Sequence, residues 1–254
     1  MIYPTDLPVK IVMLGAGGTG AYIAPNLYRL LYVLDRPSRF IICDGDIVER
    51  KNLRRQNFAP VDLGENKAKV IAERYSQAFG METEYIPGFI EDLNELRELV
   101  TPRRWALDPN APYRQVTEMV ILIGAVDNNK SRRLCHEAFM QANDLIYIDS
   151  GNSEFTGQVV CGVRKGGRTV RKPVAALFPE MLEDTDKFPS ELSCAEAAMS
   201  DPQSMAANLT AATAVTTIVY NILTHGENLA RQIDFSTRTV RMQTVLERQR
   251  RKAA

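Results

Sequence analysis

The chain has 254 residues, of which 45% are hydrophobic and 24% are charged. This composition is that of a folded domain and excludes an extended disordered chain. Thirty-one basic residues balance thirty-one acidic ones, which excludes the strong overall charge typical of nucleic-acid and membrane-surface binders.

No signal for export or membrane insertion stands out. The first residues contain neither a basic stretch nor an apolar segment of the secretory type, so we expect a cytoplasmic protein. The longest weakly polar run, at 209–223, is interrupted by Asn221 and is too short and too polar to cross a bilayer. We expect this run to be a core helix, and we expect no nucleic-acid or membrane partner.

The first half of the chain alternates between predicted strands and helices. An apolar run at 9–14 ends in a glycine-rich turn, after which apolar residues recur at helical spacing. Further strands are predicted at 39–43, 82–90, 119–123 and 145–148, and helices at 66–79, 93–100 and 127–142. This order predicts an α/β fold with a Rossmann-like, doubly wound and mainly parallel sheet, which binds ligands beyond the carboxyl ends of its strands.

The second half has a different character. Segments 158–164 and 168–174 are predicted to pair as antiparallel strands, and 178–201 to form a long loop. The proline-rich segment 101–115 is predicted to be a surface insertion. We therefore expect a single domain over 1–254, with a nucleotide-binding core at 9–165 and an antiparallel C-terminal extension. That extension, 166–254, would hold a crossover loop, a helix and a final strand or tail.

The turn after the first strand carries Gly15, Gly17, Gly18 and Gly20. Glycines at this spacing let backbone N–H groups approach a phosphate at the start of a helix, because no side chain blocks them. Asp44 follows at the expected end of the second strand, where a carboxylate can accept hydrogen bonds from ribose hydroxyls. These features predict a nucleotide site that suits NAD, FAD or ATP equally.

The segment after Asp44 distinguishes between these three candidate nucleotides. It contains a second acid, Asp46, then Asn-Leu-Arg-Arg-Gln at 52–56 and Gly-Glu-Asn-Lys at 64–67. This pattern resembles the superfamily of ThiF, MoeB and the ubiquitin-activating (E1-like) enzymes, whose members adenylate a carboxyl terminus. The likeness continues in Asp127-Asn128, in Arg132 and in Gly157-Gln158, and it covers roughly residues 9–165 well and the remainder loosely.

The resemblance implies ATP and Mg²⁺ and gives roles to individual residues. Asp44 would bind the ribose, and Asp127 the magnesium, with Asp46 as a second metal contact. The phosphates would be bound by Asn52, Arg55 and Lys67, and Gln56 would belong to the polar framework of the site. An Asp-Asn pair before a helix can also be an N-cap, a role compatible with metal binding. The residues expected at the nucleotide are Gly15, Gly17, Gly18, Gly20, Asp44, Asp46, Asn52, Arg55, Gln56, Lys67, Asn128 and Arg132. Those expected to act in catalysis are Arg55, Lys67, Asp127 and Cys194.

Cys194 lies in the predicted crossover loop, where some members of the superfamily carry a cysteine that takes the acyl group as a thioester. Glu191 and Glu196 would raise the pKa of its thiol rather than activate it, so an incidental cysteine is the alternative. The sequence has no C-x-x-C pair, unlike MoeB and ThiF, so we expect no structural zinc. The N-terminal arginine that homodimeric members lend to their partner also has no obvious counterpart.

The resemblance implies an ATP-dependent adenylyltransferase that activates a C-terminal carboxylate and releases pyrophosphate. The expected acceptor is a small ubiquitin-like or sulfur-carrier-like protein, and the expected assembly is a homodimer. The chain also looks similar to the ThiF-related protein of the bacterial PRTRC (ParB-related, ThiF-related) cassette. Two alternatives remain: an NAD-dependent oxidoreductase, which leaves the residues after Asp44 unexplained, and a catalytically inactive E1-like scaffold subunit.

Overall fold

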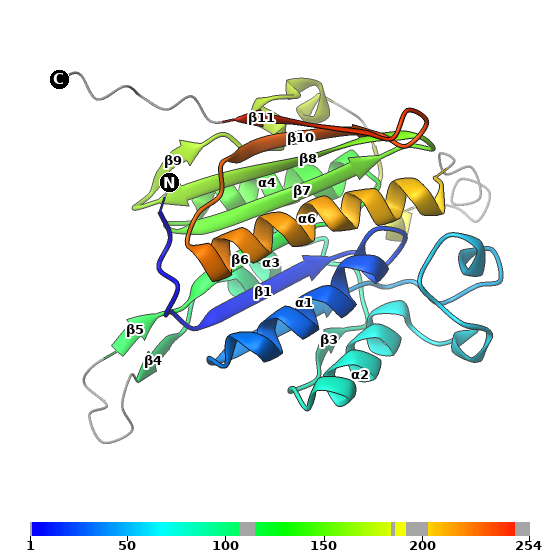
Figure 1. The fold of residues 1–254 in the computed structure, drawn as a ribbon, viewed down its shortest axis with the longest axis horizontal. Helices are drawn as coiled ribbons and strands as arrows, with labels where there is room; N and C mark the ends of the chain where they lie inside the picture. Colours follow the sequence, from blue (N-terminus) through cyan, green and yellow to red (C-terminus); the bar gives the residue numbers. More distant parts are fainter. Residues whose placement is uncertain (1, 107–114, 184–185, 192–202, 247–254) are drawn as a thin grey trace.

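The computed structural model describes residues 2–106, 115–183, 186–191 and 203–246. Within these residues, nine strands form one sheet in the order β11-β10-β8-β7-β6-β1-β2-β3, with β9 paired to β8 (Figure 1). The strands are β1 Val9–Leu14, β2 Ser38–Cys43, β3 Glu84–Ile86, β6 Met119–Gly124, β7 Leu145–Asn152, β8 Thr156–Lys165, β9 Arg168–Arg171, β10 Ala230–Ser236 and β11 Arg241–Leu246.

The sheet has a parallel half and an antiparallel half. Strands β3, β2, β1, β6 and β7 run parallel, whereas β8, β10 and β11 continue from β7 in antiparallel pairs. Every residue of β1 and β6 is buried, because helices cover both faces of the central strands. The predicted Rossmann-like sheet with an antiparallel C-terminal extension is confirmed.

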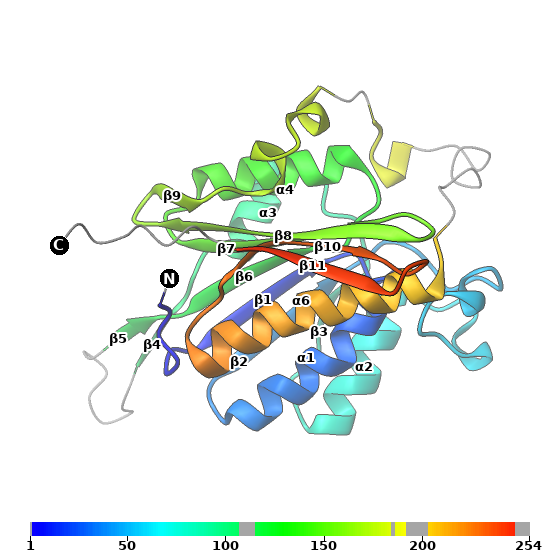
Figure 2. The same cartoon turned by 45° about the horizontal axis from the view of Figure 1, so that its top comes forward.

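Helices α1 (Gly20–Leu34), α2 (Lys67–Phe79) and α6 (Met205–His225) cover one face of the sheet, and α3 (Leu93–Val100) and α4 (Asn129–Gln141) cover the other (Figure 2). Alternate residues of β1 serve the two layers, since Ile11 and Met13 pack in the first core and Val12 and Leu14 in the second. This arrangement leaves the carboxyl edge of the parallel strands bounded by loops.

Helix α6 is longer than the sequence suggested. It has 21 residues and is, by length and composition alone, long and apolar enough to cross a membrane, so the expectation that it is too short and too polar was wrong. Its Val215, Ile218 and Ile222 nevertheless pack into the core beneath the sheet, as a core helix does. The Ser204 side chain caps its first turn, and Gly226 ends it in the left-handed conformation.

Several predicted boundaries moved because of pairing that the sequence does not reveal. Strand β7 extends to Asn152, beyond the predicted end at 148, because it pairs with β8 as far as Asn152 and Gly157. The segment predicted at 82–90 forms only the short strand β3. The insertion predicted at 101–115 holds β4 (Arg104–Ala106), which pairs in a two-stranded ladder with β5 (Gln115–Thr117) at and beyond its end.

Candidate functional site

The glycine turn between β1 and α1 lies at the carboxyl edge of the sheet. A Cβ atom at Gly15 would lie 2.4 Å from the Ala125 carbonyl oxygen, and one at Gly20 would lie 2.0 Å from the Gly15 oxygen. These glycines are therefore required by the fold itself. A Cβ atom at Gly17 would instead have a single neighbour within 4 Å among the described residues, the Gln56 amide nitrogen at 3.9 Å. The absence of a side chain at position 17 thus leaves the backbone of the turn accessible from the space beside it.

Asp44 at the end of β2 is buried and ties the glycine turn to the sheet. Its carboxylate accepts hydrogen bonds from the backbone N–H of Ala16 at 2.6 Å and of Asp46 at 2.8 Å. Burial raises the pKa of Asp44 to about 6, and the positive charge of Lys67 opposes this rise. Asp44 therefore stands next to the bare turn, where the sequence placed a ribose-binding carboxylate.

Lys67 begins helix α2 and is buried, with its ammonium group 2.7 Å from Asp46 Oδ2. Asn66 directly before it is the N-cap, and its amide also donates to the carbonyl oxygens of Asp44 at 2.8 Å and Asp46 at 3.1 Å. The structure therefore pairs Asp46 with Lys67, and the metal contact expected for Asp46 stays a prediction.

Asn52, Arg55 and Gln56 follow on the loop after β2. Asn52 is buried, and its Oδ1 accepts from the backbone N–H of Glu49 at 2.8 Å, so it fixes the loop. The Arg55 guanidinium donates to Gln203 Oε1 at 2.6 Å. The buried side-chain oxygen of Gln56 has no hydrogen-bond partner within the described residues, and its amide lies next to Gly17. A buried polar atom without a partner beside a bare turn is typical of a ligand site.

Asp127 and Asn128 lie between β6 and α4, and Asn128 takes the capping role. The Asn128 side chain accepts from the backbone N–H of Ser131 at 2.8 Å and is the N-cap of α4. Asp127 is exposed and makes no hydrogen bond or ion pair in the part of the chain that the structure describes. A single carboxylate fits magnesium, which binds one or two carboxylates together with the phosphate oxygens of a substrate.

Arg132 on α4 points toward protein groups. Its guanidinium donates to the Val126 carbonyl oxygen at 2.7 Å and lies 3.5 Å from the Asp149 carboxylate. The nucleotide contact expected for Arg132 stays a prediction.

A second polar network behind the turn was not predicted. Thr19 donates to Asn152 Oδ1 at 3.0 Å, and Asn152 donates to Asn208 Oδ1 at 2.9 Å. Asn208 in turn donates to the Arg55 carbonyl oxygen at 3.1 Å, and it is fully buried on α6. This network joins α6 to the glycine turn and to the loop that carries Arg55. No motif marks Asn208 in the sequence.

The described cysteines are unsuited to nucleophilic chemistry. Cys43, Cys135 and Cys161 are buried, and burial raises the pKa of the Cys135 thiol to about 12. A thiol that stays protonated at neutral pH is a poor nucleophile. Cys194, the predicted thioester residue, lies outside the described residues.

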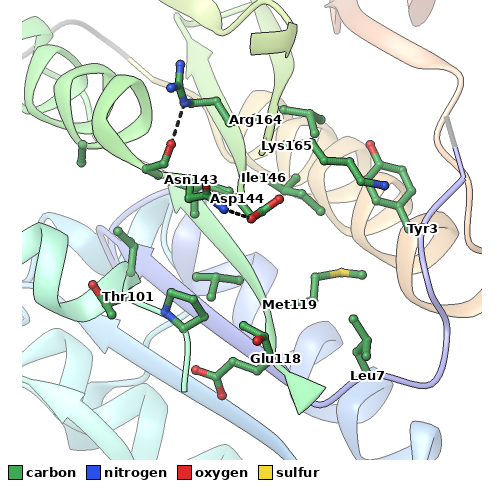
Figure 3. Close-up of a pocket in the computed structure, with 18 of the residues that line it drawn as sticks. Tyr3, Leu7, Thr101, Glu118, Met119, Asn143, Asp144, Ile146, Arg164 and Lys165 are labelled. Carbon is green, nitrogen blue, oxygen red and sulfur yellow. Dashed lines mark hydrogen bonds between the residues drawn. The ribbon is translucent and has the colours of Figure 1, made fainter. Parts of the chain in front are cut away.

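A cavity of about 570 Å³ lies at the opposite, amino edge of the sheet, lined by the N-terminal segment and by β6, β7 and β8 (Figure 3). Two charged groups on its wall are engaged: Glu118 accepts from the Trp105 indole at 2.8 Å, and Arg164 donates to the Ala142 carbonyl oxygen at 2.8 Å. Since none of the residues of the glycine turn lines it, we place the candidate site at the carboxyl edge instead.

The sheet, the bare glycine turn and the basic residues at the carboxyl edge define a Rossmann-like α/β protein with a candidate nucleotide site. A model of the ThiF family matches residues 7–253 of the chain. The chain belongs to the ThiF family, as the motifs after Asp44 predicted. The narrower PRTRC assignment stays a prediction.

Known relatives are similar in sequence and in fold. The NEDD8-activating enzyme E1 catalytic subunit of Saccharomyces cerevisiae is 29% identical over 158 residues, which are 59% of this chain and 46% of that protein. PaaA matches 94% of this chain and 64% of its own, with a TM-score of 0.62 and 18% identity. E. coli MccB, solved with ATP, matches 93% of this chain and 63% of its own, with a TM-score of 0.61 and 17% identity.

The chain therefore spans about half the length of the curated relative and less than two thirds of these solved chains. The likeness to PaaA and MccB shows that this chain has the same fold as these two proteins.

Proposed function

We propose that the protein is an ATP-dependent adenylyltransferase that activates a C-terminal carboxylate as an acyl-adenylate. The observation that carries the proposal is the meeting, at one edge of the sheet, of a bare glycine turn, the buried Asp44, two basic residues and the exposed Asp127 carboxylate. Membership of the ThiF family and the E1 catalytic subunit among its relatives support this chemistry.

In the proposed reaction, a carboxylate oxygen of the acceptor forms a bond to the α-phosphorus of ATP. The bond from that phosphorus to the bridging oxygen breaks, and pyrophosphate leaves with the electron pair. Gly17 would allow backbone N–H groups to approach the phosphates, and Asp44 would accept hydrogen bonds from the ribose. Arg55 and Lys67 would neutralise the triphosphate, which requires Arg55 to exchange Gln203 for a phosphate oxygen.

Magnesium bound with ATP would stabilise the negative charge on the departing pyrophosphate. Asp127 is the residue we assign to hold it. The exposure of this carboxylate and the assignment of the capping role to Asn128 support that choice.

The acceptor and the assembly belong to the same proposal. We propose a small ubiquitin-like protein, a sulfur-carrier-like protein or a short peptide as the acceptor, since an E1 subunit and MccB solved with MccA are among the similar proteins. We further propose a cytoplasmic homodimer, and a thioester on Cys194 in the event that the acyl group moves to a thiol.

Calorimetric titration with magnesium-ATP, and separately with NAD, tests the nucleotide. Wild type should bind ATP and ignore NAD, and Arg55→Ala should weaken ATP binding by about tenfold or more, because one charge-assisted contact to phosphate is lost. Lys51→Ala removes an exposed lysine from the same loop, paired only with the exposed Glu49 within the described residues, and is the matched control. NAD binding alone would move the assignment to an oxidoreductase.

Exchange of labelled pyrophosphate into ATP, in the presence of a candidate acceptor, tests the chemistry. Asp127→Ala should abolish magnesium-dependent exchange and leave the fold, followed by circular dichroism, intact. An unchanged exchange rate in Asp127→Ala would remove this residue from the metal site. Nucleotide binding without any exchange, across acceptors ending in Gly-Gly and short peptides, would favour the inactive scaffold.

A further inference from the structure

A buried ion pair of Asp149 and Arg132 lies next to the loop that carries Asp127. Asp149 on β7 is 1% exposed, and its Oδ2 accepts from the Tyr147 hydroxyl at 2.8 Å. Its Oδ1 lies 3.5 Å from Nε of Arg132. Burial raises the pKa of Asp149, while Arg132 and Tyr147 favour its charged form. A buried ion pair is a costly feature that adds little net stability, so it suggests a role other than stability.

The other side of the Arg132 guanidinium holds the loop. It donates to the carbonyl oxygen of Val126 at 2.7 Å and to Oδ1 of Asn129 at 3.2 Å. Val126 immediately precedes Asp127, and Asn129 follows two residues later. Arg132 therefore holds the chain by hydrogen bonds on both sides of the exposed Asp127 carboxylate.

Two glycines make room for this ion pair. A Cβ atom at Gly124 would lie 3.1 Å from Asp149 Oδ2, and one at Gly151 would lie 3.2 Å from Nη2 of Arg132. Both distances are shorter than ordinary van der Waals contact. The ion pair is thus closely enclosed, and Arg132 has little freedom to turn away from the loop.

We propose that Asp149 is a positioning residue, which through Arg132 fixes the loop at 125–128 and with it the Asp127 carboxylate. Outer groups that orient a metal ligand commonly contribute a factor of about 10–100 to metal affinity. The inference rests on the proposed function, since it concerns the metal that would accompany ATP. Its two consequences, order in the loop and affinity for the metal, can be measured separately.

The first experiment tests, without any ligand, whether Asp149 and Arg132 fix the loop at 125–128. Asp149→Asn keeps the size of the side chain and removes its charge, so Arg132 should loosen and amide hydrogen exchange at 126–128 should become about tenfold faster. Tyr147→Phe removes only the hydroxyl group and should act in the same direction more weakly. Asp144→Asn makes the same chemical change just before β7 begins, at the other end of that strand, and should leave these amides unchanged.

The second experiment measures the metal rather than turnover. Mn²⁺ binding to the complex with the ATP analogue AMPCPP is followed by electron paramagnetic resonance. Asp149→Asn and Arg132→Lys should each weaken Mn²⁺ binding by about tenfold, because lysine cannot bridge the carboxylate and the loop. Metal-free binding of AMPCPP should stay unchanged in Asp149→Asn.

The outcomes separate the possible failures. Unchanged amide hydrogen exchange at 126–128 in Asp149→Asn would refute the positioning role of Asp149, whether or not the protein is an adenylyltransferase. Faster exchange with unchanged Mn²⁺ affinity would refute the link to Asp127. Absence of Mn²⁺ binding by the wild-type complex would overturn the proposed function and the role given to Asp149. This would hold even where amide hydrogen exchange showed that Asp149 fixes the loop.

Discussion

Asp44 shows how one side chain can serve both fold and ligand. Its two oxygens already accept backbone N–H groups of Ala16 and Asp46, which aligns the glycine turn with the end of β2. Because burial raises its pKa to about 6, the carboxylate is charged at neutral pH and becomes protonated just below it. The contribution of Asp44 to folding is favourable below its ordinary pKa and is lost as the pH rises through about 6.

Nucleotide binding should depend on pH in the opposite direction, because ribose hydroxyls donate best to the ionised form. We expect the affinity for magnesium-ATP to fall by up to about tenfold per pH unit below about pH 6. Calorimetry from about pH 7 to about pH 5 measures this change. Asp44→Asn should bind weakly and retain only the pH dependence of ATP itself. An equal pH dependence in both proteins would rule out Asp44 as the titrating group.

At the scale of elements, the glycine turn touches two different neighbours. Gly18 faces α6, since a Cβ atom there would lie 2.4 Å from the Asn208 amide nitrogen. Gly17 faces the candidate site. Neighbouring glycines in one turn thus have different reasons to lack a side chain: one allows α6 to approach the turn, and the other leaves room for the phosphates.

Alanine substitutions should separate these reasons. Gly18→Ala should destabilise the protein by about 1–3 kcal/mol in urea unfolding, because the added methyl group forces Asn208 and the start of α6 to shift. Gly17→Ala should leave the unfolding midpoint nearly unchanged and weaken ATP binding by about tenfold or more. Equal effects of the two changes on unfolding would contradict this division.

At the scale of the whole molecule, the two edges of the sheet serve different purposes. The carboxyl edge gathers the candidate site, whereas the amino edge contains a buried ion pair between Lys10 and Glu118, 3.1 Å apart. Glu118 also accepts from the backbone of Arg103 and from the Trp105 indole, and so anchors the β4 segment. Burial works against the charge of Glu118, but these donors together with Lys10 lower its pKa below the ordinary value.

Glu118→Gln should destabilise the protein by about 3–5 kcal/mol at neutral pH, because Lys10 is left buried without its carboxylate. For wild type, the contribution of Glu118 should be present above its ordinary pKa and be lost as the pH falls through its lowered pKa. Denaturant unfolding at several pH values checks both expectations. Glu65→Gln, which breaks the exposed pair with Lys69, should leave the midpoint unchanged. A similar loss of stability in Glu118→Gln and Glu65→Gln would mean that the cost of breaking an ion pair does not depend on its burial.

Sequence alone determined the local parts of this protein: the apolar runs of β1 and β6, the glycine turn after β1 and the motifs that mark the ThiF family. Local chain geometry fixes such features, so spacing reveals them. Only the tertiary structure decided that Asn208 contacts the glycine turn, that Lys10 pairs with Glu118 and that Arg132 pairs with Asp149. The contacts of Asn208 and of Lys10 join segments far apart in the chain, and they follow from the order of strands in the sheet, which no local pattern specifies.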